Sequence, residues 1–242
     1  MKIPSINQLP KQPNTLKDLY SNFERNCHAV SDCNFAEVKD TFQKLNVEYT
    51  KQGFGRQFFF NSEQLTDNLI KNGNFKLANI LINELGKIYM RIGKNDLAEK
   101  TIMQSMDIST QLNDNLHVLA RLSDLEILYK KSGNRKRLFQ ILHDKKQCAK
   151  DIINDYDNCV KNFQSLHREP ASLDAVKKQL AYTYSGLADL LMHSKPKDSL
   201  KLTQKAKEIY DELGQQKEAE YLKIKIGIIE RYIKKKANKT KM

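Results

Sequence analysis

Apolar residues recur at helical spacing along most of the chain, and one short pattern returns with a period of forty. Its fixed points are Tyr49, Tyr89 and Tyr129, with Gly53, Gly93 and Gly133 and with Leu45, Leu85 and Leu125. Large apolar residues stand seven and four positions before each tyrosine, which places them on one face of a helix. The glycine four positions after each tyrosine is typical of a helix end, because glycine adopts the left-handed cap conformation without strain. The pattern therefore predicts a series of antiparallel helix pairs.

The clearest copy reads "LGKIYMRIGKNDLAEKTI" from Leu85 to Ile102. Gly93 ends its first helix, and "NDLAEK" begins a second helix with an apolar face at Ala98 and Ile102. Gly86 stands inside the first helix, where glycine costs roughly 1 kcal/mol relative to alanine. We expect that the missing side chain lets the second helix approach closely.

This order of leucine, small residue, aromatic residue, glycine and alanine resembles the tetratricopeptide repeat in its longer, 40-residue variety. The residues that carry the resemblance are Leu85, Gly86, Tyr89, Gly93 and Ala98. The chain departs from the family pattern at Phe58, Leu138 and Lys145, where small residues are usual, and the closing proline of the family is absent. The resemblance implies an all-α fold, in which antiparallel helix pairs stack into a right-handed α-α superhelix.

The predicted organisation is a repeat domain over residues 14–233 between an extended arm and a basic tail. Three prolines fall within residues 1–13, which favours an arm, and "KKKANKTKM" at 234–242 is the tail. Within the domain we expect repeats near 39–78, 79–118, 119–169 and 181–214, with capping helices at 14–30 and 216–233. Such arrays need caps because one unit alone cannot bury its apolar face.

The third unit carries a helical insertion within residues 134–169. The fourth unit has Leu187 in the place of Leu125 and therefore begins later than the regular period requires. Apolar residues continue at spacings of three and four through the insertion. Either one helix runs about twice the usual length, or a break near "NDYDN" makes an added helix. We favour the single long helix.

Composition indicates a globular chain of the cytoplasm. Hydrophobic residues make up 40% and charged residues 29% of the 242 residues. No apolar run reaches the roughly 18 residues of a membrane span, and the N-terminus lacks the apolar core of a secretory signal. Four widely spaced cysteines do not form a disulfide framework, and they lack the spacing of a zinc site. We expect no metal and no cofactor.

Catalytic motifs are missing from the sequence. The stretch "GFGRQFFF" has glycines but not the strand-turn-helix context of a phosphate-binding loop. The five histidines have no acid or nucleophile at a telling spacing. We therefore expect that the protein is not an enzyme.

The resemblance also implies that the first helix of each pair lines a groove that binds a peptide or a partner helix. The positions that this assigns to partner binding are Lys51, Asn83, Lys87, Met90, Arg91, Ser123, Ile127, Lys130, Lys131, Tyr182 and Asp189. One relative position is basic three times, at Lys51, Arg91 and Lys131. This basic series favours an acidic partner segment, although a solvated helix end would have the same residues.

The main hypothesis is a non-catalytic scaffold or adaptor that binds a protein or peptide, with no role at a membrane. An alternative is a nucleic-acid-associated protein, because the net charge is +12 and half of it lies from Lys201 onward. A third hypothesis is a peptide-sensing regulator with repeats of similar length. The segment 1–33, which precedes the repeats, is too short for a helix-turn-helix domain.

Overall fold

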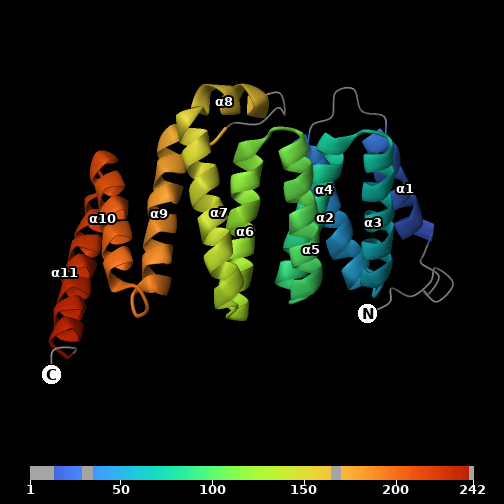
Figure 1. Cartoon of the computed structure of the whole chain (residues 1–242). Coiled ribbons are helices and arrows are strands. Elements are labelled where there is room, and N and C mark those ends of the chain that lie inside the picture. Colours follow the sequence, from blue (N-terminus) through green and yellow to red (C-terminus); the bar gives the residue numbers. More distant parts are fainter. Residues whose placement is uncertain (1–13, 29–34, 165–169, 240–242) are drawn as a thin grey trace. The chain divides into compact units, whose positions relative to one another are not determined.

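The computed structural model describes residues 14–28, 35–164 and 170–239, and most of these residues are helical (Figure 1). The described part contains eleven helices joined by turns and connections, without a strand. The predicted all-α fold is therefore confirmed. The expected arm at residues 1–13 lies outside the described residues, as do residues 240–242.

Six consecutive helices begin at a constant interval, which is half of the sequence period. They are α2 (Phe35–Lys51), α3 (Gly55–Lys71), α4 (Phe75–Arg91), α5 (Asn95–Gln111), α6 (Asn115–Ser132) and α7 (Arg135–Asn154). Each of the turns between them contains one residue with positive φ, namely Gly53, Gly73, Gly93, Asn113 and Gly133. At Gly93 the φ angle is 73°, and the next amide, of Lys94, donates to the carbonyl of Tyr89. The left-handed turn therefore reverses the chain between neighbouring helices.

The chain divides into two compact units, with the boundary between Ser109 and Thr110 near the end of α5. Unit 1 comprises α1 (Asn14–His28) to α5, and unit 2 comprises α6 to α11. Each unit is a stack of antiparallel helices, the arrangement expected of a helical-repeat solenoid.

Aromatic side chains fill the core of unit 1. Phe42, Tyr49 and Phe58 are fully buried, and the rings of Phe42 and Phe58 lie 5.0 Å apart. The expected close approach at Gly86 is confirmed, because a Cβ atom there would lie 3.1 Å from Ile102 Cγ1 on α5. Such a separation is tighter than ordinary packing. Glycine at position 86 therefore allows α4 and α5 to pack closely.

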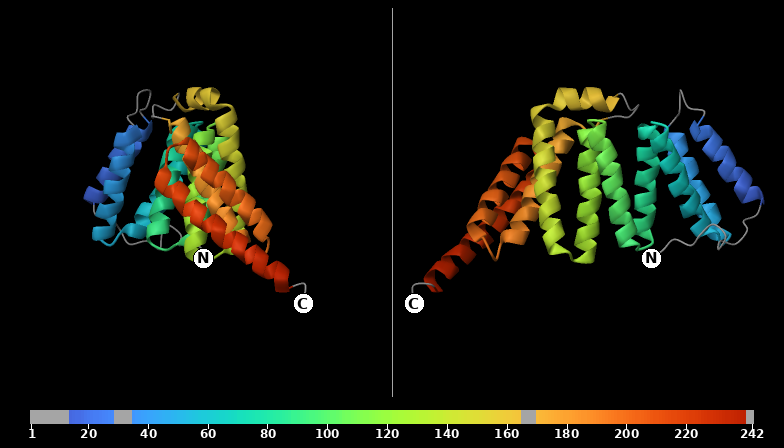
Figure 2. Two further views of the ribbon diagram at one scale, coloured as in Figure 1. Left: turned by 90° about the vertical axis from the view of Figure 1, so that its left-hand side faces the viewer. Right: turned by 45° about the vertical axis from the view of Figure 1, so that its right-hand side comes forward.

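In unit 2, helices α9 (Leu173–Leu191), α10 (Pro196–Glu212) and α11 (Gln216–Lys239) follow α6, α7 and a short added helix, α8 (Tyr156–Gln164). Leu119, Ile152, Leu180 and Leu222 belong to one core cluster, which draws on α6, α7, α9 and α11. Helices α10 and α11 lie side by side at the end of this unit (Figure 2).

The preferred interpretation of the insertion as one long helix is wrong. Helix α7 ends at Asn154, and Asp155 adopts φ −133° and ψ 45°, outside helical geometry. The Asp155 side chain instead accepts a hydrogen bond from Asn158 Nδ2 at 2.8 Å. Aspartate also has a low intrinsic helix propensity, which favours a break at this residue. Helix α8 then runs across the end of α7 (Figure 1).

Two helix boundaries differ from the expected units. Helix α9 begins at Leu173, where the Ser172 hydroxyl oxygen accepts from the amide of Ala175, so the fourth helix pair starts before residue 181. Helix α11 continues to Lys239, past the expected end at 233. The lysines at 234, 235 and 236, which were expected in a basic tail beyond the repeat domain, therefore lie on helix α11.

Candidate partner-binding surface

The predicted partner-binding residues fall on both units, and each unit is described by itself. In unit 1, Lys51 and Arg91 are the last residues of α2 and α4, and both are exposed. Asn83, Lys87 and Met90 on α4 are partly buried.

In unit 1 the buried carboxylate of Glu84 forms an ion pair with Lys87, one of the predicted residues. The Glu84 carboxylate accepts hydrogen bonds from Gln43 Nε2 at 2.6 Å and from Lys87 Nζ at 3.0 Å, and Lys39 Nζ lies at 3.8 Å. Burial raises the pKa of Glu84, but Lys87, Gln43 and Lys39 together outweigh it, and the net pKa is lowered. Lys87 therefore already has a partner inside unit 1.

The three basic residues of the series share a position at the end of a helix. Lys51, Arg91 and Lys131 all lie in the last turns of their helices. Cations are favourable there because the helix macrodipole is negative at its C-terminus, an effect worth about 0.3–1 kcal/mol. Lys131 belongs to unit 2 and the other two to unit 1. Their alignment along one edge stays a prediction.

Unit 2 contains a second buried carboxylate, bound by two lysines. Glu126 on α6 accepts from Lys130 Nζ at 2.6 Å and from Lys145 Nζ of α7 at 2.8 Å. Glu126 and Lys145 are both almost fully buried. Burial raises the pKa of Glu126, but the hydrogen bonds and charges of the two lysines outweigh it, so its net pKa is lowered. Lys145 also explains the departure from a small residue at this position, because its ammonium group satisfies Glu126.

The same lysines hold Tyr182 of α9 in place. The Tyr182 hydroxyl lies 3.0 Å from Lys130 Nζ, which donates to it. The ammonium groups of Lys130 and Lys145 lie 4.8 and 5.7 Å from the centre of the Tyr182 ring, within the range of a cation–π interaction. Tyr182 nevertheless keeps 50% of its surface exposed. The cluster therefore presents a tyrosine to solvent in a defined orientation.

Two further predicted residues, Ser123 and Ile127, lie on the same face of α6 as Lys130. Ser123 Oγ lies 3.4 Å from Gln179 Oε1 of α9 and 3.0 Å from the carbonyl of Leu119. Ile127 stands on α6 between Ser123 and Lys130, both of which contact α9, and it is 56% exposed. We call Ser123, Ile127, Lys130, Lys131 and Tyr182 the α6–α9 surface. The structure places these five predicted residues on neighbouring helices of unit 2.

Asp189, the last predicted residue, contacts the terminal helix. Its carboxylate lies 2.7 Å from Lys225 Nζ of α11, which is also 3.1 Å from Ser185 Oγ. Three exposed apolar residues of α11 were not among the predicted residues, namely Tyr221, Ile224 and Ile228. Their spacing of three and four residues could have identified them from the sequence as one face of a helix. The sequence does not tell this face from the second apolar face of α11, which is buried.

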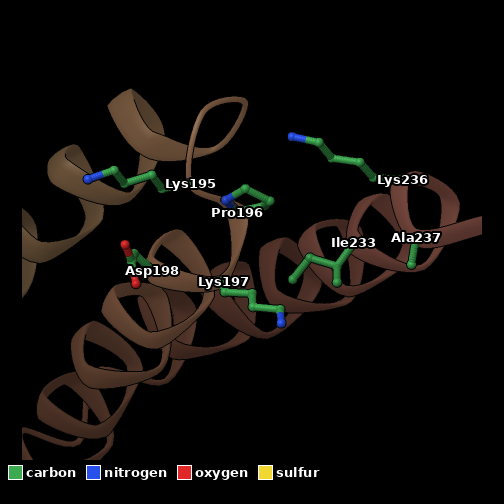
Figure 3. A pocket seen from close by; sticks show the side chains of 7 residues that line it. All are labelled: Lys195, Pro196, Lys197, Asp198, Ile233, Lys236 and Ala237. Atoms are coloured by element: carbon green, nitrogen blue, oxygen red, sulfur yellow. The ribbon is translucent and has the colours of Figure 1, made fainter. Parts of the chain in front are cut away.

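A hollow of about 440 Å³ lies where the start of α10 meets the end of α11. Its lining residues are Lys195, Pro196, Lys197, Asp198, Ile233, Lys236 and Ala237. Figure 3 shows the three lysine side chains pointing in different directions, so their ammonium groups do not converge on one point. The hollow offers no assembled set of binding groups.

The described residues contain no group of three or more His, Cys, Asp or Glu side chains placed to hold a metal ion. Within the same part of the chain no helix combines the length and the apolar character that crossing a membrane requires. Cys148 and Cys159 are free thiols, and burial raises the pKa of Cys148 to about 12.

Comparison with known proteins does not assign this chain to a family. No protein-family model matches the chain, and no curated protein is similar to it in sequence. Among solved structures, the chain is similar to BtubC (BKLC) from P. vanneervenii, with 14% identity, 91% of each chain covered and a TM-score of 0.44. It is also similar to the de novo designed helical repeat protein DHR64, with 11% identity, 92% of this chain and 96% of the design covered, and a TM-score of 0.31. Both likenesses are too low to bear on function.

Proposed function

We propose that this protein is a non-catalytic binding protein that holds a segment of a partner protein on the α6–α9 surface. The observation that carries the proposal is Tyr182, a half-exposed tyrosine held by Lys130 and Lys145. The exposed Ile127 lies about one turn before Lys130 on α6. Tyrosine is among the residues that dominate binding energy at protein interfaces.

The fixed orientation of Tyr182 favours binding over a merely exposed side chain. An interface loses about 0.5–1.5 kcal/mol for each flexible side chain that it immobilises. Tyr182 has already lost this freedom, because its hydroxyl and its ring are both held. A partner segment that packs against the ring therefore meets a preformed contact.

The charge of the surface favours an acidic partner segment. Lys131 is exposed at the end of α6, and the Lys130 side chain keeps 40% of its surface exposed although it bonds to Glu126. Basic residues around an apolar contact accelerate association with acidic partners and select against basic ones.

The proposal is tested by capture from the native lysate with immobilised protein, using Tyr182→Ala as the test variant and Tyr221→Ala as its matched control. Both tyrosines are at least half exposed, but only Tyr182 belongs to the α6–α9 surface. We expect a protein that the wild type and Tyr221→Ala retain and that Tyr182→Ala loses. Tyr182→Phe should keep most of the binding, because the ring remains.

The same capture is repeated after nuclease treatment. A captured protein that disappears with nuclease, or nucleic acid held equally by all variants, would support the nucleic-acid alternative. Equal capture by Tyr182→Ala and the wild type would overturn the proposed surface.

A further inference from the structure

Helix α11 exposes a second apolar surface, distinct from the α6–α9 surface. Tyr221, Ile224 and Ile228 are 65%, 64% and 43% exposed. Their spacing of three and four residues places them on one line along the helix. They make up a continuous apolar stripe, whereas isolated exposed apolar residues need no explanation.

The stripe is separate from the face that holds α11 in unit 2. That packed face contains Ala219, Leu222, Lys225 and Ile229, which are all buried, and it packs against α10. The helix is therefore apolar on two sides. Packing within the described part of unit 2 accounts for one of these sides only.

Basic residues stand at both ends of the exposed stripe. Continuing the same helical line, Lys217 precedes Tyr221 by four residues, while Arg231 and Lys235 follow Ile228 by three and seven. All three are exposed. At 1.5 Å per residue the line is about 27 Å long, and its apolar centre is about 10 Å long. Over its whole length α11 has eight basic and three acidic residues.

We propose that this α11 surface, defined as Lys217, Tyr221, Ile224, Ile228, Arg231 and Lys235, binds an amphipathic helix of another protein that carries acidic residues at both ends of its apolar stripe. An added helix buries the three apolar side chains as a helix-in-groove partner does. Its acidic ends meet Lys217 at one end, and Arg231 and Lys235 at the other. This inference does not rest on the proposed function of the α6–α9 surface.

The charge pattern argues against a second copy of this chain as the occupant. In an antiparallel pair of α11 helices centred on the stripe, Lys217 of one copy lies beside Arg231 of the other. In a parallel pair each lysine faces its own equivalent. Like charges in contact cost affinity in both arrangements. A partner with acidic ends replaces this repulsion with attraction.

The stripe is also a poor fit to a membrane or a nucleic acid. Three apolar residues on one helix bury little area, whereas helices that lie in a membrane interface present a long apolar face. Nucleic-acid binding is driven by phosphate contacts and does not require two exposed isoleucines between the cations.

The test measures binding of three synthetic helical peptides of equal length by fluorescence anisotropy. The first has leucines along one line and glutamates at both ends, the second has lysines at both ends, and the third keeps the glutamates but has alanines for leucines. We expect the acidic-ended leucine peptide to bind at least about tenfold more tightly than the other two, because it alone matches both features of the surface.

Two double variants test whether the peptide binds at the α11 surface. Ile224→Asp with Ile228→Asp should weaken binding of the acidic-ended leucine peptide by more than about tenfold, since its apolar contact is lost. Lys217→Glu with Lys235→Glu should reverse the preference toward the lysine-ended peptide. The matched control is Ile92→Asp, the same change at a comparably exposed isoleucine of unit 1 that belongs to neither surface, which should leave the affinity unchanged. Ile127→Asp tests separately whether the peptide binds the α6–α9 surface instead. Circular dichroism melting of each variant confirms that the fold is intact.

Several results would overturn the inference. One is loss of the peptide in Ile127→Asp together with its retention in the Ile224→Asp and Ile228→Asp variant. Another is a dimer in sedimentation that the two α11 changes dissociate. A third is binding to phosphatidylserine vesicles or to a single-stranded DNA oligonucleotide that depends on Ile224 and Ile228, with no binding of the acidic-ended leucine peptide. The first result would move the peptide to the α6–α9 surface, whereas the other two would leave the proposal for Tyr182 untouched, so failure of the two proposals can be told apart.

Discussion

Lys145 shows how a single residue can contradict a family pattern and still stabilise the fold. Its side chain is buried between α6 and α7 at a position where a small residue is usual, and its ammonium group lies 2.8 Å from the Glu126 carboxylate. A buried charge is costly unless it is paired and hydrogen-bonded. Here the ion pair offsets the cost of burying the two charges, and the Tyr182 ring of α9 lies against the Lys145 ammonium group.

Breaking this pair should strongly destabilise unit 2. Lys145→Met removes one partner and leaves Glu126 with Lys130 alone, so we expect a loss of about 3 kcal/mol in the free energy of unfolding. Urea denaturation measures the loss. Lys131→Met, which removes an exposed lysine from the end of α6, should change the free energy by less than about 0.5 kcal/mol. Equal effects of the two changes would mean that the Glu126–Lys145 pair contributes nothing.

The Glu126 carboxylate also predicts that the stability of the protein depends on pH. The pKa of Glu126 is lowered in the folded protein from its ordinary value of 4.5, so the folded state favours the charged form. Its contribution to stability is fully present above pH 4.5 and is lost as the pH falls through the lowered folded pKa. Glu126→Gln should therefore show a smaller loss of stability on acidification, measured by urea midpoints near neutral pH and well below pH 4.5. A wild type and variant with parallel pH profiles would contradict this.

At the scale of elements, the turns matter as much as the helices. Helices α2 to α7 begin at a constant interval, and the residue that reverses the chain has positive φ in every one of the intervening turns. Asn113 takes the place of glycine in one of them, with φ 54°. Asparagine tolerates this region better than other non-glycine residues, so the period of turns is kept although the period of glycines is interrupted.

The effect of a substitution in a turn on stability should depend on the backbone φ angle of the residue that is replaced. Gly93→Ala places a Cβ atom in the left-handed region at φ 73° and should cost about 1–2 kcal/mol of stability. Asn113→Gly should change stability by less than about 0.5 kcal/mol, because relief of the left-handed strain is offset by a more flexible unfolded chain. Urea denaturation of both variants tests this. A neutral Gly93→Ala would show that the turn angle is not retained in solution.

At the scale of the whole molecule, the series Lys51, Arg91 and Lys131 spans both units. Each residue is exposed at the end of a helix, and the helix dipole alone is a sufficient reason for a cation there. A joint role in binding requires that cations from unit 1 and unit 2 act on the same partner segment. The repeat predicts such a role but does not require it.

Charge reversal at two of these positions distinguishes the two explanations. Arg91→Glu with Lys131→Glu should leave the free energy of unfolding almost unchanged, because exposed charges contribute little. If the series binds an acidic partner, the double variant should weaken the binding of the protein captured through Tyr182 by more than about tenfold and remove most of its salt dependence. Unchanged affinity would leave the helix dipole as the only role of these residues.

The sequence by itself determined the helical class and the antiparallel pairing, because both depend on local features. A tyrosine, a leucine and a glycine at fixed spacing specify one apolar face and one turn, and Gly86 already indicated a close contact. The half-period of single helices was also present at Gly53, Gly73, Gly93 and Gly133, hidden by Asn113. The five residues of the α6–α9 surface were likewise named from their repeat positions.

Only the tertiary structure decided how charges and exposed faces are used. Glu126 and Lys145 lie on different helices, and nothing local identifies them as a pair, or Tyr182 as their neighbour. The choice at Asp155 between one helix and two is made at a single residue, whose backbone leaves helical geometry although the apolar period continues past it. On α11 both faces are apolar, and which one is buried depends on contacts with α9 and α10. Periodicity predicts a face, but only packing decides whether that face is covered.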